Sequence, residues 1–124
     1  MTVAPQQSGV LRGIAVAVQD TAAAERLLGR VTDLPVTVRD GDRWTALEAG
    51  GLTVALTVTE ELPGGAAVSL NVKVADVAAA HEELIAAGAL SVMAPALTAH
   101  EERAAVRLGD SVVLSIYRSL PRQA

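Results

Sequence analysis

The sequence predicts an α+β protein that consists of two βαβββ modules in tandem. Residues 18–24 recur as residues 74–80, in both cases as Val-x-Asp followed by an Ala-rich stretch. Alternating apolar residues precede each copy, and three strand-like runs follow it. A chain of 124 residues is the length of about one domain, so the two copies are modules of a single fold.

The first module begins with apolar residues that alternate with small ones, including Ile14 and Val16, which is typical of a strand. Asp20 is well placed to accept hydrogen bonds from the free amides of a following helix, and Gly29 predicts the end of that helix. Three strands with Gly-containing turns between them are predicted next, at residues 35–39, 43–49 and 52–59.

The second module repeats this order of elements. Leu70 and Val72 take the place of the apolar residues in the first strand, Asp76 predicts the start of a helix, and Gly88 predicts its end. The three strands that follow are predicted at residues 92–97, 104–108 and 111–118.

The predicted plan is a single domain over residues 1–124. Module one covers about residues 10–60, a linker that contains Pro63-Gly64-Gly65 covers 61–65, and module two covers about 66–120. Apolar residues at helical spacing predict which side chains the helices bury, and alternation in the strands predicts further core residues. These predicted core residues are Leu27, Leu28, Val31, Leu47, Val77, Leu84, Ile85, Val106 and Leu108.

The composition excludes several classes of function. The chain has no cysteine, which excludes disulfide scaffolds, Cys-based zinc sites and thiol nucleophiles, and is consistent with a reducing cytoplasm. A net charge of −4 without a basic stripe argues against nucleic acid as a partner. The uncharged stretch 84–99 is too short to span a bilayer and contains Gly88 and Pro95, so no membrane partner is expected. We expect a cytoplasmic protein.

The repeat and its local motifs resemble the vicinal oxygen chelate superfamily, which contains glyoxalases, bleomycin-resistance proteins and extradiol dioxygenases. The resemblance covers residues 10–118. It implies the glyoxalase/bleomycin-resistance fold: cupped, mostly antiparallel sheets with the helices on the outside, a ligand cleft inside, and a homodimer. The motifs that carry it are Val18-Gln19-Asp20, Val74-Ala75-Asp76, Ala86-Ala87-Gly88, Pro95 and the hairpin 103–117.

Metal-dependent members of this superfamily place a His, Glu or Gln early in the first strand of each module. The matching positions here are Gly13 and Ser69, and the closing strands offer Ala55 or Thr57 in one module and Ser115 or Leu114 in the other. None of these residues supplies an imidazole or a carboxylate, which divalent metal sites need. The sequence therefore predicts neither a metal nor another cofactor.

Strand alternation predicts which side chains face the cleft. If the apolar residues of the first strands face the helices, then Gly13, Ala15, Ser69, Asn71 and Lys73 face the cleft, and Tyr117 does so if Ser115 does. The candidate ligand-binding residues are Trp44, Glu48, Ser69, Asn71, Lys73, Arg103, Arg107 and Tyr117.

Each of the candidates also has a purely structural interpretation. Trp44 either stacks on a planar ligand or covers the edge of an apolar patch. Glu48, Arg103 and Arg107 either contact a ligand or form ion pairs across strands on a solvated sheet. Lys73 either holds an anionic group or makes a dimer or solvent contact.

Three hypotheses about function follow. The first is a metal-independent protein that binds a small molecule as a homodimer and sequesters a toxic compound or antibiotic. The second is a metal-free isomerase or lyase for a small carboxylate, with Glu48 as general base and Lys73 or Arg107 stabilising negative charge. The third is a noncatalytic regulatory module whose cleft is filled by its own side chains.

Overall fold

The computed structural model describes residues 8–121, and it confirms the predicted α+β class with two βαβββ modules. Two short 3-10 turns, η1 (Thr59–Glu61) and η2 (Pro63–Gly65), connect the modules. Module one consists of β1 (Val10–Ala17), α1 (Thr21–Leu28), β2 (Val36–Asp40), β3 (Trp44–Ala49) and β4 (Leu52–Thr57). Module two consists of β5 (Val68–Lys73), α2 (Val77–Ala86), β6 (Ser91–Leu97), β7 (Glu101–Gly109) and β8 (Val112–Ser119).

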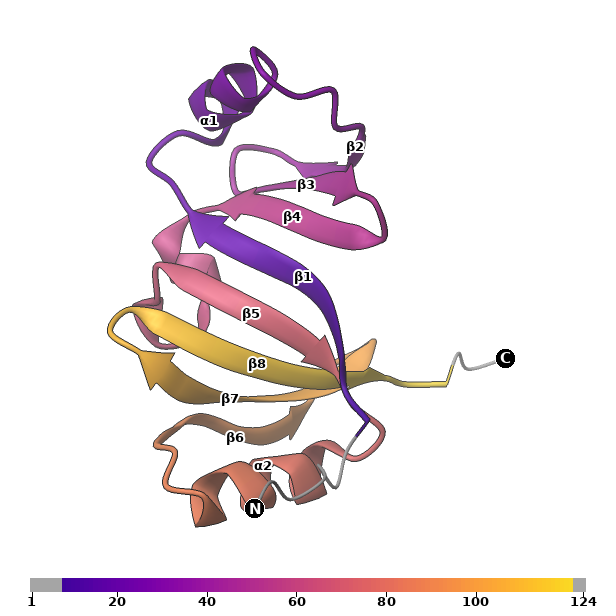
Figure 1. Ribbon diagram of the computed structural model, residues 1–124, viewed down its shortest axis with the longest axis vertical. Helices are drawn as coiled ribbons and strands as arrows, with labels where there is room; N and C mark the ends of the chain where they lie inside the picture. Colours follow the sequence, from indigo (N-terminus) through magenta and orange to yellow (C-terminus); the bar gives the residue numbers. More distant parts are fainter. Residues whose placement is uncertain (1–7, 122–124) are drawn as a thin grey trace, which may run out of the picture.

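All the strands form one sheet in the order β2-β3-β4-β1-β5-β8-β7-β6, with α1 near one end and α2 near the other (Figure 1). Within the modules, β1 runs parallel to β4 and β5 runs parallel to β8, while the hairpins and the junction between β1 and β5 are antiparallel. The sheet is therefore mixed and mostly antiparallel, as predicted.

The β1–β5 junction places the two modules symmetrically. Ile14 pairs with Leu70 at its centre, Gly13 pairs with Asn71, and Ala15 pairs with Ser69. Gly13 and Ser69 are consequently equivalent about a pseudo-twofold axis, as are Ala15 and Asn71. The structure thus agrees with the repeat on which the fold prediction depends.

The two helix starts are stabilised by side chains at equivalent positions. The carboxylate of Asp20 accepts a hydrogen bond from the amide of Ala23 at 3.0 Å, and that of Asp76 accepts one from Ala79 at 3.0 Å. Caps of this kind contribute about 1 kcal/mol each. Both predicted caps are confirmed.

Helix α2 packs on the sheet face that we call the helix face. Its buried Val77 and Ala80 form a cluster with Val74, Ala104 and Ile116. The helix therefore lies on the outside of the sheet, and the predicted burial of Val77 is confirmed. Ile85, which was also predicted to be buried, is 39% exposed because it lies beside this contact stripe.

Helix α1 buries less than the sequence predicts. Thr21 is its one fully buried residue, whereas Leu27 and Val31 are 72% and 83% exposed. The helix has two turns, so only positions on the stripe that begins at Thr21 and ends at Leu28 reach the sheet. Leu27 is off this stripe and Val31 follows the helix end, so both predictions were wrong.

Strand alternation correctly predicts the buried Leu47 and Val106 but fails at Leu108, which is 55% exposed. The pairing between β7 and β8 shifts register between Arg107 and Gly109, close to the tip of this hairpin. Alternation along β7 therefore no longer determines which residues are buried at this end of the strand.

No helix within residues 8–121 has the length and apolar character needed to span a membrane.

Candidate functional site: a cavity between the two modules

A cavity of about 510 Å³ lies on the sheet face opposite to the helix face, which we call the cavity face. Strands of both modules line it, together with the η1–η2 connection. Its volume is within the range of about 300–1,000 Å³ that small-molecule sites occupy. The hypothesis that the cleft is filled by its own side chains is therefore wrong.

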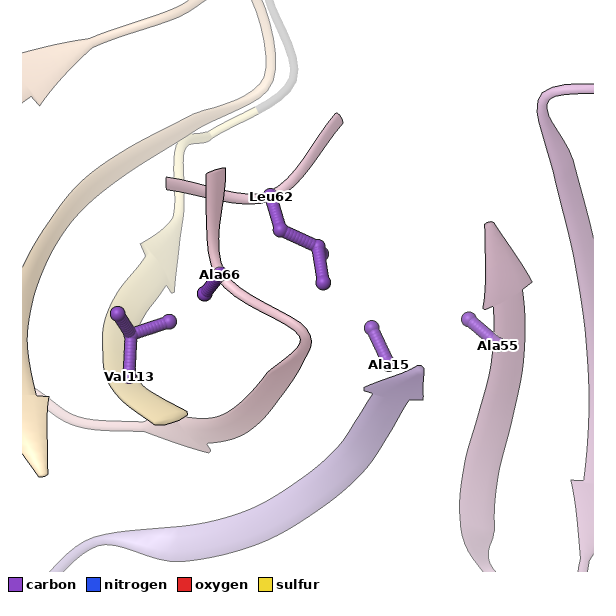
Figure 2. Packing of buried hydrophobic residues seen from close by; sticks show 5 residues of the cluster. All are labelled: Ala15, Ala55, Leu62, Ala66 and Val113. Carbon is purple, nitrogen blue, oxygen red and sulfur yellow. The ribbon is translucent and has the colours of Figure 1, made fainter. Parts of the chain in front are cut away.

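The connection between the modules packs over one part of the cavity face. Leu62 and Ala66 are buried and form a cluster with Ala15, Ala55 and Val113 from three strands of the sheet. Figure 2 shows Leu62 directed towards Ala15 and Ala55. The segment that joins the modules thus also closes one side of the cavity with apolar groups.

The two halves of the cavity differ in chemistry at equivalent positions. In module one, Ala15 and Ala55 pair across β1 and β4, and both are buried and apolar. In module two, Asn71 and Ser115 pair across β5 and β8 at the equivalent places. We call these the apolar wall and the polar wall.

The polar wall is built around a chain of hydrogen bonds. The Ser69 hydroxyl donates to Asn71 Oδ1 at 2.7 Å, and Ser69 Oγ lies 2.8 Å from Ser115 Oγ. Ser69 has a single proton, which Asn71 accepts, so Ser115 is the donor in the second bond. The chain holds Asn71 with its oxygen occupied and its Nδ2 group close to Gly13.

Charged residues gather at the edge of the polar wall. Arg12, Glu101 and Arg103 all line the cavity, together with the hydroxyl-bearing Tyr117. Burial raises the pKa of the Tyr117 hydroxyl above its usual 10, and Glu101 raises it further, whereas Arg12 lowers it. Tyr117 is therefore protonated at neutral pH and can donate a hydrogen bond.

The amino-acid sequence has a relative among known proteins. No family model matches the chain. Over 84 residues it is 37% identical to an uncharacterized protein of Mycolicibacterium smegmatis, an alignment that covers 68% of this chain and 72% of that protein. The chain belongs to the same family as that protein.

Solved structures identify the fold. A glyoxalase/bleomycin resistance protein/dioxygenase superfamily member from Vibrio splendidus superposes with a TM-score of 0.70 at 16% identity, covering 93% of this chain and 100% of that chain. The chain has the glyoxalase/bleomycin-resistance fold. A methylmalonyl-CoA epimerase from Mycobacterium tuberculosis shares this fold, with a TM-score of 0.65 at 16% identity over 98% of this chain and 94% of that chain. At such identity, the likeness shows the fold and not the activity.

Many proteins with the glyoxalase fold are expected to hold a divalent metal in the cup, so we tested whether these residues could do so. The resemblance predicts ligands at Gly13 and Ser69, at Ala55 or Thr57, and at Ser115 or Leu114. Three of these side chains have no donor atom, and the Thr57 hydroxyl donates to the backbone oxygen of Arg43. The hydroxyls of Ser69 and Ser115 already bond to each other and to Asn71. In residues 8–121, moreover, no three His, Asp or Glu side chains cluster as a metal site requires. The donor set does not fit a metal.

Five of the eight predicted ligand-binding residues line the cavity of this glyoxalase-type fold. They are Trp44, Ser69, Asn71, Arg103 and Tyr117. Ser115 also lines the cavity, which places Tyr117 on the same face of β8. The structure thus brings these residues together, while ligand binding by them stays a prediction.

The other three predicted residues lie outside this lining. The carboxylate of Glu48 accepts a hydrogen bond from the backbone amide of Gly51 at the β3–β4 turn. Lys73 is exposed at the end of β5, and Arg107 lines a smaller cavity of about 120 Å³ beneath the η2 turn. Glu48 and Arg107 are separated by four intervening strands of the sheet, so the predicted general base does not lie beside this arginine, which was predicted to stabilise negative charge.

Sequence reasoning missed Arg12 and Glu101. Alternation from Gly13 places Arg12 on the helix face, but the β1–β5 register shifts between Leu11 and Gly13, and Arg12 lines the cavity. A glycine inside a strand can mark such a bulge, so Gly13 was the available sign. Glu101 lies outside the strand predicted at residues 104–108, whereas β7 begins at this residue.

Proposed function

We propose that this protein binds a small organic molecule in the cavity between its modules, without a metal ion, and sequesters that molecule. The observation that carries the proposal is the cavity of about 510 Å³. It contains a hydrogen-bonded polar wall at positions where metal-dependent proteins of this fold are expected to hold the metal ion. An apolar wall faces one part of the ligand, and a polar wall faces another.

The position of Glu48 favours binding over catalysis. A general base has to lie within hydrogen-bond reach of the proton that it takes from the substrate. Glu48, which the enzymatic hypothesis requires, is instead bound to the β3–β4 turn.

The binding function can be tested by blocking the cavity. Thr53→Phe adds an aromatic ring at a residue that lines the cavity, while Val38→Phe adds the same ring on an exposed position of β2 as a control. A fragment collection of neutral, acidic and basic aromatic compounds is screened by ligand-observed NMR. Compounds that bind the wild type should bind Val38→Phe equally and lose binding to Thr53→Phe, with matching circular dichroism spectra of the variants.

Two outcomes would contradict the proposal. If no compound in the collection binds, or if Thr53→Phe binds every compound as well as Val38→Phe does, the cavity is not a ligand site. Elemental analysis after dialysis against zinc, nickel, manganese or iron tests the second part of the proposal. If the wild type retained stoichiometric metal and the Ser69→Ala and Ser115→Ala variants did not, the protein would depend on a metal.

We also propose that the protein is a homodimer that uses the centre of its helix face. Helix α1 packs chiefly on β3 and β4, and α2 on β6, β7 and β8 with Val72 at its border, so β1 and most of β5 lie between the two helices. Leu11 is 45% exposed there, and Ile14 and Leu70 are half-buried. Burial of such apolar surface favours association. Sedimentation velocity should show a dimer that Leu11→Asp weakens, and a wild-type monomer at micromolar concentration would contradict this.

A further inference from the structure

The proposed binding function does not specify which class of compound enters the cavity. The charged side chains at the edge of the cavity indicate that class. We infer that the ligand is an organic carboxylate with a flat apolar body, and that Arg12 binds the carboxylate. The inference rests on the proposed function, because it assigns the ligand class of the same cavity.

The charges at the cavity leave one arginine without a partner. Glu61 has a close partner in Arg43 at 2.6 Å, and Glu101 has a distant one in Arg103 at 3.9 Å. Arg12 forms no ion pair with any other residue in the range 8–121. Two arginines and two glutamates line the cavity, but Arg43 neutralises Glu61 from outside the lining, so with Arg43 counted one positive charge is in excess, and it lies on Arg12.

The backbone is shaped so that Arg12 reaches the cavity. The register shift between Leu11 and Gly13 turns this side chain away from the helix face, to which regular alternation would assign it. The next residue, Gly13, has no side chain to occupy the same space. Bulges that redirect a side chain in this way are common beside binding sites. A guanidinium presents a planar fork of donors that matches a carboxylate in two parallel hydrogen bonds.

The neutral groups near Arg12 are also donors. Asn71 uses its oxygen to accept from Ser69, so it presents its Nδ2 group, and Tyr117 is protonated at neutral pH. Arg103 adds a second guanidinium, on a side chain that is 48% exposed. Apart from Glu101, which lies 3.9 Å from Arg103, these groups present donors. Donors favour a ligand group that only accepts, and an ionised carboxylate is such a group.

The rest of the cavity is apolar, so we expect the ligand to have an apolar body. Leu62, Trp44 and Met93 line this part, and Leu62 and Trp44 pack with the buried cluster that contains Ala15 and Ala55. Trp44 offers an aromatic ring on which a flat ligand can stack. A purely polar acid would leave this half of the cavity without favourable contacts.

Three compounds that share one body test the inference. Biphenyl-4-carboxylate, biphenyl-4-carboxamide and biphenyl-4-methylamine carry a negative, a neutral and a positive group on the same ring system. Calorimetry gives their affinities, and the fluorescence of Trp44, the protein's one tryptophan, reports whether they enter the cavity. The carboxylate should bind at least about tenfold more tightly than the carboxamide, as expected for hydrogen bonds to a charged group, and the amine should bind most weakly.

Substitution of Arg12 should remove this preference. Arg12→Gln is expected to weaken carboxylate binding about tenfold and to change carboxamide binding by less than about threefold. Arg30→Gln, at an exposed arginine outside the cavity lining, should change neither. Because Arg12 is itself exposed, the variant should fold, and Arg103→Gln provides a second variant, with a smaller expected loss of carboxylate binding.

The possible failures are distinguishable. Equal affinity for carboxylate and carboxamide, or an unchanged preference in Arg12→Gln, would overturn the inference and leave the binding function intact. If none of the three biphenyl compounds binds but neutral compounds of the fragment screen bind and are blocked by Thr53→Phe, the ligand class is wrong and the function stands. Absence of any binding in both experiments would overturn both.

Discussion

The two walls of the cavity have the same backbone arrangement and different chemistry. Ala15 and Asn71 are equivalent about the pseudo-twofold axis of the β1–β5 junction, and so are Ala55 and Ser115 on the next strands. On one side these positions pack beneath Leu62, and on the other they form a hydrogen-bonded chain with Ser69. The difference shows that the duplicated fold fixes where side chains lie, while each half has acquired its own role.

The connection between the modules explains why the walls are not interchangeable. Leu62 and Ala66 pack in the same buried cluster as Ala15 and Ala55, and Figure 2 shows Leu62 above Ala15 and directed towards it. Because a chain passes from module one to module two only once, this cover has no counterpart over the polar wall. Asn71 and Ser115 are half-buried, whereas Ala15 and Ala55 are buried.

Reciprocal substitutions should therefore have unequal effects, and this is the largest difference we predict. Ala15→Asn places a polar amide at a fully buried position beneath Leu62, where the neighbouring Ser69 is already bonded to Asn71 and Ser115, and should destabilise the protein by about 3 kcal/mol. Asn71→Ala removes one acceptor from the hydrogen-bond chain and should cost about 1 kcal/mol. The free energy of unfolding from urea denaturation measures both.

The comparison would fail if the two substitutions cost the same. In that case the apolar wall would tolerate polar groups, and the distinction between the walls would have no energetic basis. The double variant separates the alternatives further, since the two positions lie on neighbouring strands and could compensate each other if the walls were truly interchangeable.

A second, smaller effect concerns the connection itself. Gly64 in η2 has φ +63°, and a Cβ there would lie 2.8 Å from Val92 Cγ1 in module two. Gly50 in the β3–β4 turn also has φ +63°, but nothing lies within 4 Å of a Cβ at that position. Gly64→Ala should cost about 2 kcal/mol and Gly50→Ala about 1 kcal/mol, because both adopt a left-handed conformation and only the first also clashes.

Urea denaturation of both glycine variants measures the difference, which is the contribution of close packing between the connection and module two. Equal costs would mean that the backbone conformation accounts for the whole effect and that Val92 moves freely. A lower affinity of Gly64→Ala for biphenyl-4-carboxylate would show in addition that the connection shapes the cavity.

The sequence predicted the parts of this molecule that depend on a repeating backbone pattern. The repeat gave the order of the elements, both helix caps, and the placement of Ser69 and Asn71 on the same face as Gly13. These predictions succeeded because strand alternation and capping are local, and because duplication supplies each of them twice.

The parts that could not be predicted depend on contacts between distant segments or on breaks in the pattern. Arg12 enters the cavity because of a one-residue register shift, and Leu62 packs on Ala15 from between two short 3-10 turns that the sequence did not predict. Likewise, Leu27 looks like a core residue in the sequence, but the short α1 turns it away from the sheet. At a bulge, the side chain of a polar residue such as Arg12 can point to either face of the sheet. The residue type alone does not predict which face it is.

The smallest predicted effect concerns the side-chain contacts between each helix and the edge strand of its module. Glu25 on α1 and His81 on α2 occupy equivalent positions of the repeat. Arg39 of β2 donates two hydrogen bonds to Glu25, at 2.7 and 3.0 Å, whereas His81 Nε2 lies 2.8 Å from Ser91 Oγ of β6. Both helices thus contact an edge strand, but only α1, which buries little, does so through an ion pair.

The hydrogen bonds from Arg39 hold the pKa of Glu25 below its usual 4.5. A carboxylate whose pKa is lower in the folded state stabilises that state above pH 4.5, and this contribution disappears as the pH falls through the lowered pKa. Arg39→Gln should therefore reduce stability slightly at neutral pH and have no effect in strong acid, because exposed ion pairs contribute little. An NMR titration should show the pKa of Glu25 rising in Arg39→Gln and staying unchanged in the control Arg30→Gln. A stability difference that persisted below the lowered pKa would mean that Arg39 acts through packing of its side chain rather than through its charge.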